Sequence, residues 1–257
     1  MKKLLWFFLF FIFILPIDLL QAQNFILGAR GGISIPNLTA GGSKSNPLNT
    51  GYSSRFGPDV ALTGELKFSQ LFSLETMIEY SSQGGKKNGF QALTVPEEYI
   101  PAFPAGQVPP YLYADYKSEA KLKYLLVPIL GKFSWKLGPQ SPLKGYLDAG
   151  PFAGYLLSAK QVTRGSSIIY ADPQKQNPLT PTAQSFDDKT DIANQLNKFN
   201  FGVSGNVGLG YHFNRSVVFI EGGGNYGFLN IQKGEKNGKN HTGAGTVGIG
   251  YGYLLDK

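Results

Sequence analysis

The sequence predicts an all-β protein whose single domain is an eight-stranded antiparallel up-and-down transmembrane β-barrel. Three observations predict this fold. A secretory signal precedes eight stretches in which apolar and polar residues alternate with a period of two. The connections between these stretches alternate between long and short. Only a β-strand places alternate residues on opposite faces, and short turns at one end with long loops at the other are typical of outer-membrane barrels.

The first 22 residues have the composition of a secretory signal peptide. Lys2 and Lys3 form a basic start, residues 4–20 are almost entirely apolar, and Ala22 supplies the small residue of a cleavage site. We therefore expect export and removal of residues 1–22.

An uncleaved inner-membrane anchor is the alternative interpretation of the signal. Pro16 and Asp18 interrupt the apolar stretch, and its 17 residues fall short of the ~20 that a spanning helix needs. Residues 23–257 then form one barrel domain with a net charge of +6. The chain has no cysteine, which excludes disulfides, thiolate metal ligands and a cysteine nucleophile.

The pattern predicts eight strands, and the connections between them are either long or short. The predicted strands are 24–36, 56–68, 71–83, 119–133, 145–158, 199–213, 216–229 and 242–255. The long connections are 37–55, 84–118, 159–198 and 230–241, whereas 69–70 and 214–215 are two-residue turns. An even strand number places both termini on one side, which we expect to be the periplasm of a Gram-negative bacterium. The four long connections then face outside.

The apolar face of the strands is expected to contact lipid. A soluble barrel would bury this face instead, but aromatic residues gather at both ends of the strands, as they do in interfacial girdles. One group is Phe25, Phe68, Phe72, Phe133, Phe213 and Tyr253, and the other is Tyr80, Tyr155, Phe199, Tyr226 and Phe228. The opposite face is rich in glycine, which suits a crowded interior.

The polar face predicts an ionic network inside the barrel. Its charged members are Arg30, Asp59, Glu65, Glu75, Glu79, Asp148 and Glu221. One cation among several carboxylates should be paired locally, because an isolated buried charge is costly. We expect a plug around Arg30, since eight strands leave an interior that side chains can fill. A gated narrow pore is the functional alternative.

The aromatic-rich stretch 96–116, inside the connection 84–118, is the predicted contact surface. Its aromatic candidates are Tyr99, Phe103, Tyr111, Tyr113 and Tyr116, interleaved with five prolines that stiffen the loop. A self-packed cap over the barrel mouth is the alternative. In the polar loop 159–198, residues 187–198 are compatible with a short helix.

The predicted outer loops carry an excess of positive charge. They hold 13 Lys and Arg against 8 Asp and Glu. This excess favours contact with anionic lipopolysaccharide in addition to membrane lipid, and solvated surface lysines are the alternative. An envelope or secretion-system protein is a further possible partner. Nucleic acid is not expected, because the charges are dispersed and no recognition motif is present.

Nothing in the sequence predicts an enzyme, a cofactor or a metal site. His212 and His241 are the two histidines, and neither has a ligand set at metal-binding spacing. The chain lacks a nucleophile elbow, a P-loop and a zincin motif. Residues 243–248 match G-x-G-x-x-G but lie inside a predicted strand, without the helix that a dinucleotide site needs.

Three segments resemble the PorT-like outer-membrane β-barrel proteins of Bacteroidota. They are 124–133 (YLLVPILGKF), 145–157 (GYLDAGPFAGYLL) and 200–213, which contains G-x-x-G-x-G-Y. The resemblance implies an eight-stranded barrel and supplies no catalytic residues. The founding member of that family is associated with type IX protein secretion. The family often has an acidic residue two positions before the proline of the first segment, where this chain has Leu126.

We therefore expect an integral outer-membrane protein of structural or interaction type. Its lumen is closed by polar and ionic side chains, and its long loops face outside. Two alternatives remain open at this point. One is a narrow passive or gated channel, and the other is an accessory component of type IX secretion.

Overall fold

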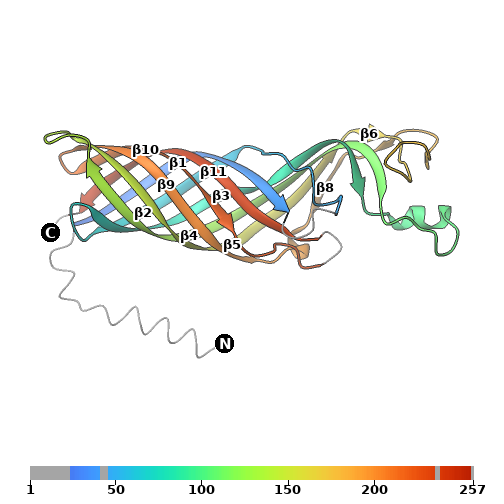
Figure 1. The fold of residues 1–257 in the computed structure, drawn as a ribbon, viewed down its shortest axis with the longest axis horizontal. Helices are drawn as coiled ribbons and strands as arrows, with labels where there is room; N and C mark the ends of the chain where they lie inside the picture. The colour runs from blue at the N-terminus through green and yellow to red at the C-terminus, as the bar shows by residue number, and fades with distance from the viewer. Residues whose placement is uncertain (1–23, 41–45, 235–237, 256–257) are drawn as a thin grey trace, which may run out of the picture.

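A computed structural model describes residues 24–40, 46–234 and 238–255. The predicted signal peptide, residues 1–22, lies outside the described residues. Eight long strands dominate the structure (Figure 1). They are β1 (Asn24–Ala40), β2 (Gly57–Lys67), β3 (Phe72–Leu93), β4 (Leu112–Lys136), β5 (Leu143–Arg164), β9 (Phe199–Phe213), β10 (Ser216–Gly227) and β11 (Asn240–Leu255). The short elements are β6 (Ser166–Ser167), β7 (Gln184–Ser185), β8 (Asp188–Asp191) and the 3-10 helices η2 (Glu97–Ala102) and η3 (Ala193–Gln195).

The eight long strands close into one antiparallel ring. Their order is β4-β3-β2-β1-β11-β10-β9-β5, and the pairing of β4 with β5 completes the circle. Every strand pairs with its neighbours along the chain, and β1 pairs with β11. This is the predicted up-and-down barrel. Closure lets backbone N–H and C=O groups of neighbouring strands pair with one another without water.

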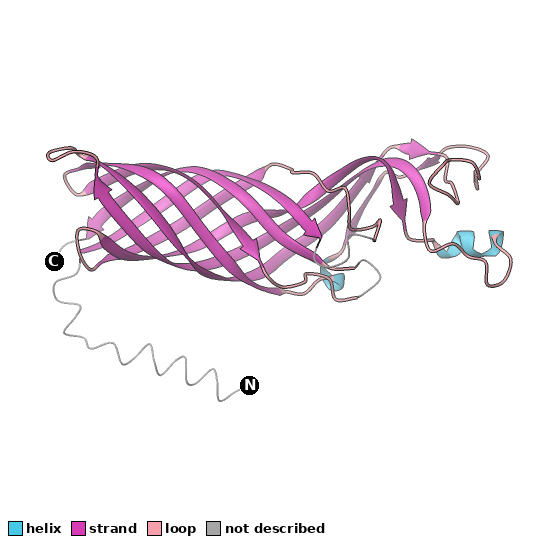
Figure 2. Ribbon diagram, viewed as in Figure 1, coloured by secondary structure: helices cyan, strands magenta, loops and turns pink. Residues whose placement is uncertain are grey.

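The two ends of the barrel differ. The turn end holds the connections 68–71, 137–142 and 214–215, and the loop end holds the others (Figures 1 and 2). The turn between β9 and β10 has the predicted two residues. Its Asn214 has a φ of 50°, a left-handed conformation that asparagine tolerates better than most residues.

Strands extend beyond the barrel at the loop end, which corrects the predicted connections 84–118 and 159–198: β3 continues to Leu93, β4 begins at Leu112 and β5 continues to Arg164, whereas residues 94–111 remain a connection. β3, β4 and β5 continue as a long twisted ribbon, and β8 pairs with β5 at residues 160–163. The ribbon points away from the barrel along its axis (Figure 1). We call residues 84–118 and 160–191 the extension.

Residues 187–198 form β8 and the short helix η3 rather than one helix. No helix in the described ranges is long and apolar enough to cross a membrane.

The two faces of the strands differ sharply in exposure. An apolar belt surrounds the barrel, and Leu62, Ile220 and Val247 on this belt are 63%, 55% and 61% exposed. The charged residues on the opposite parity, including Arg30 and Glu221, are buried inside. An apolar surface of this extent is incompatible with water as the surrounding solvent.

The barrel interior has a polar side and an apolar side. β4 and β5 contribute Leu122, Tyr124, Leu126, Phe152 and Leu156 to one buried cluster. The strands β1, β2, β3 and β10 contribute most of the buried charges. The lumen is therefore filled partly by hydrophobic packing, which the sequence pattern did not indicate.

Gly84 marks the point where the extension leaves the barrel, and its substitution is our first prediction. Gly84 has a φ of 117°, and a Cβ there would lie 2.0 Å from the carbonyl oxygen of Ala120. We expect Gly84→Ala to lower the free energy of unfolding by about 1–3 kcal/mol through backbone strain. The measurement is urea unfolding in a maltoside detergent, followed by Trp135 fluorescence.

Gly31→Ala is the matched control for this prediction. A Cβ at residue 31 meets nothing within 4 Å, so its effect should be small. Equal stability of the two variants would contradict the assigned strain.

Candidate functional site in the barrel lumen

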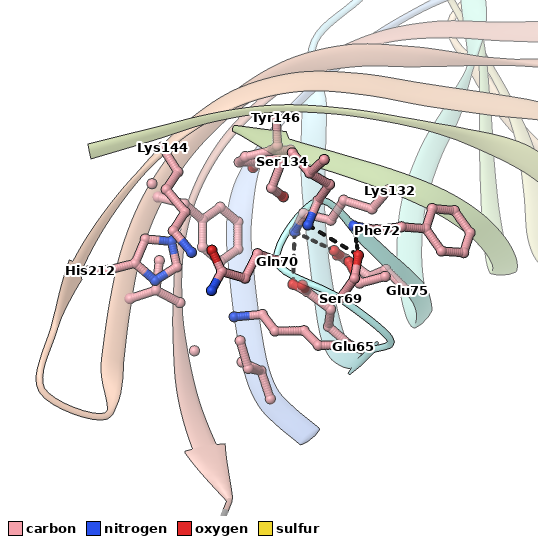
Figure 3. Close-up of a pocket in the computed structure, with 18 of the residues that line it drawn as sticks. Glu65, Ser69, Gln70, Phe72, Glu75, Lys132, Ser134, Lys144, Tyr146 and His212 are labelled. Carbon is pink, nitrogen blue, oxygen red and sulfur yellow. Dashed lines mark hydrogen bonds and ion pairs between the residues drawn. The ribbon is translucent and has the colours of Figure 1, made fainter. Parts of the chain in front are cut away.

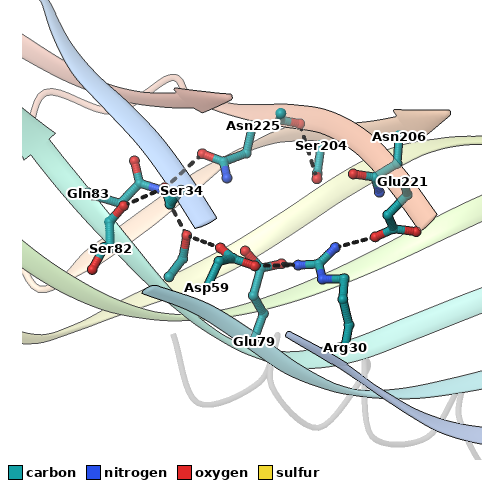
Figure 4. Close-up of polar contacts among 12 residues, drawn as sticks. Arg30, Ser34, Asp59, Glu79, Ser82, Gln83, Ser204, Asn206, Glu221 and Asn225 are labelled. Carbon is teal, nitrogen blue, oxygen red and sulfur yellow. Dashed lines mark hydrogen bonds and ion pairs between the residues drawn. The ribbon is translucent and has the colours of Figure 1, made fainter. Parts of the chain in front are cut away.

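Arg30 lies at the centre of a buried ionic cluster. Its Nη2 is 2.7 Å from Asp59 Oδ1 and 3.2 Å from Glu79 Oε2, and its Nη1 is 2.6 Å from Glu221 Oε1. Figure 4 shows the guanidinium between these carboxylates, which come from β2, β3 and β10. Arg30 is 6% exposed. One side chain on β1 thus bridges to strands on both sides of it across the lumen.

Hydrogen bonds extend this cluster toward the loop end. Ser81 Oγ donates to Asp59 Oδ2 at 2.9 Å, and Gln83 Nε2 donates to Ser81 Oγ at 3.1 Å. Gln83 Nε2 also reaches Asn225 Oδ1 on β10 at 3.2 Å, as Figure 4 shows. The polar side chains therefore connect β3 with β10 across the barrel at a second level.

Lys132 is a second inward-facing cation, which corrects the expectation that Arg30 stands alone among the carboxylates. Its Nζ is 3.0 Å from Glu65 Oε2 and 2.6 Å from Glu75 Oε2 (Figure 3). The same Nζ lies 4.2 Å from the ring centroid of Tyr146, a cation–π distance. Glu65 and Glu75 therefore pair with Lys132 and not with Arg30.

Tyr146 joins the two ionic clusters. Its hydroxyl donates to Glu221 Oε2 at 2.5 Å, while its ring lies against Lys132. Asp148 is the cross-strand neighbour of Lys132 in the β4–β5 pair, and it accepts hydrogen bonds from the backbone N–H and side-chain Nδ2 of Asn206, at 3.1 and 2.8 Å. The seven predicted lumen residues are thus all buried, but they divide into three groups.

Two cavities lie at opposite ends of the barrel. The turn-end cavity has a volume of about 470 Å³ and reaches Lys132 and Tyr146, as Figure 3 shows. The loop-end cavity has a volume of about 370 Å³ and includes Tyr52 and Lys87 in its lining. The two cavities share no lining residue. The Arg30 cluster belongs to neither lining.

Lys87 fastens the segment before β2 to the extension at the loop-end cavity. Its Nζ donates to the carbonyl oxygens of Pro47 and Leu48 at 3.3 and 2.6 Å, and it lies 4.6 Å from the ring centroid of Tyr52. Burial lowers the pKa of Lys87 to about 8. This lysine therefore has an internal structural partner and is not a free surface charge.

The five predicted contact aromatics all lie in the extension. Tyr99, Phe103 and Tyr116 pack against a buried cluster of Leu112, Ala114 and Ile169. Tyr116 also stacks on Phe186 with ring centroids 4.6 Å apart, and Tyr113 stacks on Phe90 at 6.0 Å. Tyr111 is half-buried beside them. These rings give the extension a small core of its own while remaining partly exposed.

The two histidines lie at opposite ends of the barrel. His212 lines the turn-end cavity, whereas His241 lies at the loop end, where its Nδ1 is 3.2 Å from the carbonyl oxygen of Gly227. Within the described ranges, no group of three or more His, Cys, Asp or Glu side chains could hold a metal ion.

Comparison with known proteins identifies the family. Among solved structures, OprG of Pseudomonas aeruginosa has a TM-score of 0.40 and 14% identity, covering 91% of this chain and 96% of OprG. Neisserial surface protein A has a TM-score of 0.38 and 13% identity, covering 90% of this chain and 97% of that protein. The attachment invasion locus protein Ail of Yersinia pestis has a TM-score of 0.36 and 13% identity, covering 90% of this chain and 98% of Ail. No curated protein matches. The model of the outer membrane protein beta-barrel domain matches residues 21–233, so the chain belongs to this family of outer-membrane β-barrel proteins.

Proposed function

We propose that this protein is a structural or interaction protein of the outer membrane, with a closed lumen and an extension that makes contacts outside. The Arg30 cluster carries the first part of this proposal. It ties β1, β2, β3 and β10 together between two cavities that share no lining residue. The apolar cluster on β4 and β5 fills the opposite side. We therefore expect ionic and hydrophobic packing together to close the lumen to ions.

The orientation is part of the same proposal. Short turns of bacterial barrels lie in the periplasm and longer loops lie outside. The turn end then faces the periplasm, and both termini lie there. The extension projects from the outer surface, where the excess of lysine and arginine in the loops favours contact with lipopolysaccharide phosphates.

Planar-bilayer recording tests the closed lumen. We expect no steady current from the wild-type protein or from Arg30→Ala, because the apolar wall with Leu126 and Phe152 remains when the arginine is removed. A porin inserted into the same bilayers is the positive control. Steady wild-type current would favour a passive channel. Current from Arg30→Ala alone would favour a gated channel with the ionic cluster as its gate.

The tip of the extension is the proposed contact surface. Ile100 and Val108 are exposed apolar residues on this tip and are available for contact with a partner. A photoreactive amino acid at either position should yield crosslinked adducts in intact cells. The same amino acid at Gln174, an exposed position elsewhere in the extension, is the matched control. Equal labelling from all three positions, or none, would contradict a specific contact.

A role in type IX secretion is the second candidate function, and it rests on the PorT-like resemblance. The barrel itself is compatible with an accessory place in such a machine. A deletion strain tests this role directly. Retention of secreted cargo in the cells supports it, and normal secretion removes it.

A further inference from the structure

The turn-end cavity has an uneven distribution of charge. Its deep wall holds the paired group Lys132, Glu65 and Glu75. Three further lysines line the same cavity, namely Lys67, Lys136 and Lys144, together with His212. Figure 3 shows Lys144 and His212 on the side of the cavity opposite Lys132 and Glu75. The cavity therefore carries an excess of positive charge, because its lining holds four lysines and two carboxylates.

In the part of the chain that the structure describes, none of the three additional lysines forms an ion pair with a carboxylate within 4 Å, although Glu65 is near enough to attract Lys67. Glu65 and Glu75 both form their ion pairs with Lys132. Lys67 and Lys144 both line the cavity and are half-buried, and Lys67 is attracted by Glu65 and repelled by Lys144. A cleft lined by unpaired charges of one sign concentrates ions of the opposite sign. An anion between these ammonium groups would relieve the repulsion.

The remaining lining of the cavity combines apolar and uncharged polar side chains. Its apolar members include Ile26, Val217 and Phe219. The volume of about 470 Å³ lies within the range of small-molecule sites, which combine apolar walls with a few charged groups that fix orientation. An inorganic ion would use the lysines but leave the apolar walls without a partner.

We propose that the turn-end cavity binds a small organic anion. Its phosphate or carboxylate head lies between Lys67 and Lys144, and its apolar body lies against Phe219 and the neighbouring apolar side chains. Lysine suits this role because its ammonium acts as a point charge with three donors for an oxyanion. Gln70 and Ser69 from the adjacent turn also line the cavity and can donate to the same head group.

The two histidines provide a built-in readout for this proposal. His212 lines the turn-end cavity and His241 lies at the opposite end, so their imidazole NMR signals report on the two ends separately. We expect phenyl phosphate, titrated into the full-length mature protein in a maltoside detergent, to shift the His212 signals in a saturable manner. The His241 signals should stay in place. The His241→Gln variant assigns the two sets of signals.

Matched substitutions test the role of charge. The double variant Lys67→Gln/Lys144→Gln should weaken phenyl phosphate binding ~10-fold or more, since each factor of ten corresponds to about 1.4 kcal/mol. Lys160→Gln/Lys189→Gln removes the same charge from exposed positions of the extension and should leave binding unchanged. Benzyl alcohol, a neutral analogue of similar shape, should not shift His212. Gel mobility before and after boiling confirms that each variant is folded.

An experiment in lipid nanodiscs distinguishes a lipid head group from a free anion as the natural ligand. Nanodiscs of phosphatidylcholine alone are compared with nanodiscs that also contain phosphatidylglycerol. A His212 shift caused by phosphatidylglycerol without added ligand identifies a lipid head group, whereas no shift identifies a free anion. Absence of any phenyl phosphate effect, an equal effect of benzyl alcohol, or unchanged binding by the Lys67/Lys144 double variant would overturn the proposal.

Discussion

Arg30→Met is expected to lower the free energy of unfolding by about 3–5 kcal/mol, because it removes one partner of a buried ion-pair cluster. Asp59, Glu79 and Glu221 would then face one another without a cation. Their charges are buried, so water cannot replace the guanidinium fully. Urea unfolding in a maltoside detergent, followed by Trp135 fluorescence and by gel mobility, measures the loss.

Arg164→Met is the matched control for this variant. Arg164 is exposed at the end of β5 and should tolerate the change within about 0.5 kcal/mol. Adding Glu221→Gln to Arg30→Met should recover part of the lost stability, because it removes one of the uncompensated charges. If Arg30→Met unfolds at the same urea concentration as Arg164→Met, the cluster does not hold the lumen together.

Lys132→Met should have the second-largest effect, a loss of about 3 kcal/mol. In the wild-type protein Lys132 forms ion pairs with both Glu65 and Glu75 near the turn end. The substitution leaves these two carboxylates close together without a cation between them. It also removes the cation from the ring of Tyr146. The same unfolding measurement applies.

Lys136→Met separates this effect from a general loss of positive charge. Lys136 lies four residues further along β4 and is exposed, so its replacement should be almost neutral. Glu75→Gln in the Lys132→Met background should restore stability in part. A full loss in that double variant as well would show that packing, and not charge pairing, explains the cost.

The period-two pattern predicted the barrel wall accurately because one physical rule governs it. A residue on the wall faces either the outside or the lumen, and alternate residues along β9 and β10 obey this rule in the structure. The turn at 214–215 and the buried positions of Arg30 and Glu221 followed from the same parity. The fold and the composition of the polar wall were therefore predictable.

The pairing inside the lumen was less predictable because β4 is apolar on both faces. Tyr124, Leu126 and Leu130 point inward, whereas Ile129 and Phe133 point outward. Without a clear apolar–polar alternation along β4, Lys132 was not recognised as a lumen residue. Counting back one residue from Phe133, which belongs to the aromatic girdle, would have placed Lys132 inside.

The extension was missed for a related reason. Residues 84–93 pair with β4 but lie beyond the apolar belt, so no solvent boundary forces their side chains to alternate. The segment also contains Gly84 and Gly89, both with positive φ, which are usually read as turn residues. Strand structure outside the belt depends on backbone pairing and on the small aromatic core of the extension, which a single-strand pattern does not show.

The most direct test of the account is the accessibility of its apolar belt. The chain contains no cysteine, so single cysteines at Leu62, Ile220 and Val247 can be labelled without background. In native membranes these positions should resist a membrane-impermeant maleimide, while a cysteine at Ala105, an exposed position in the extension, should react rapidly. Rapid labelling of the three belt positions in folded protein would show that they face water, and would contradict the assignment of the two faces on which the account rests.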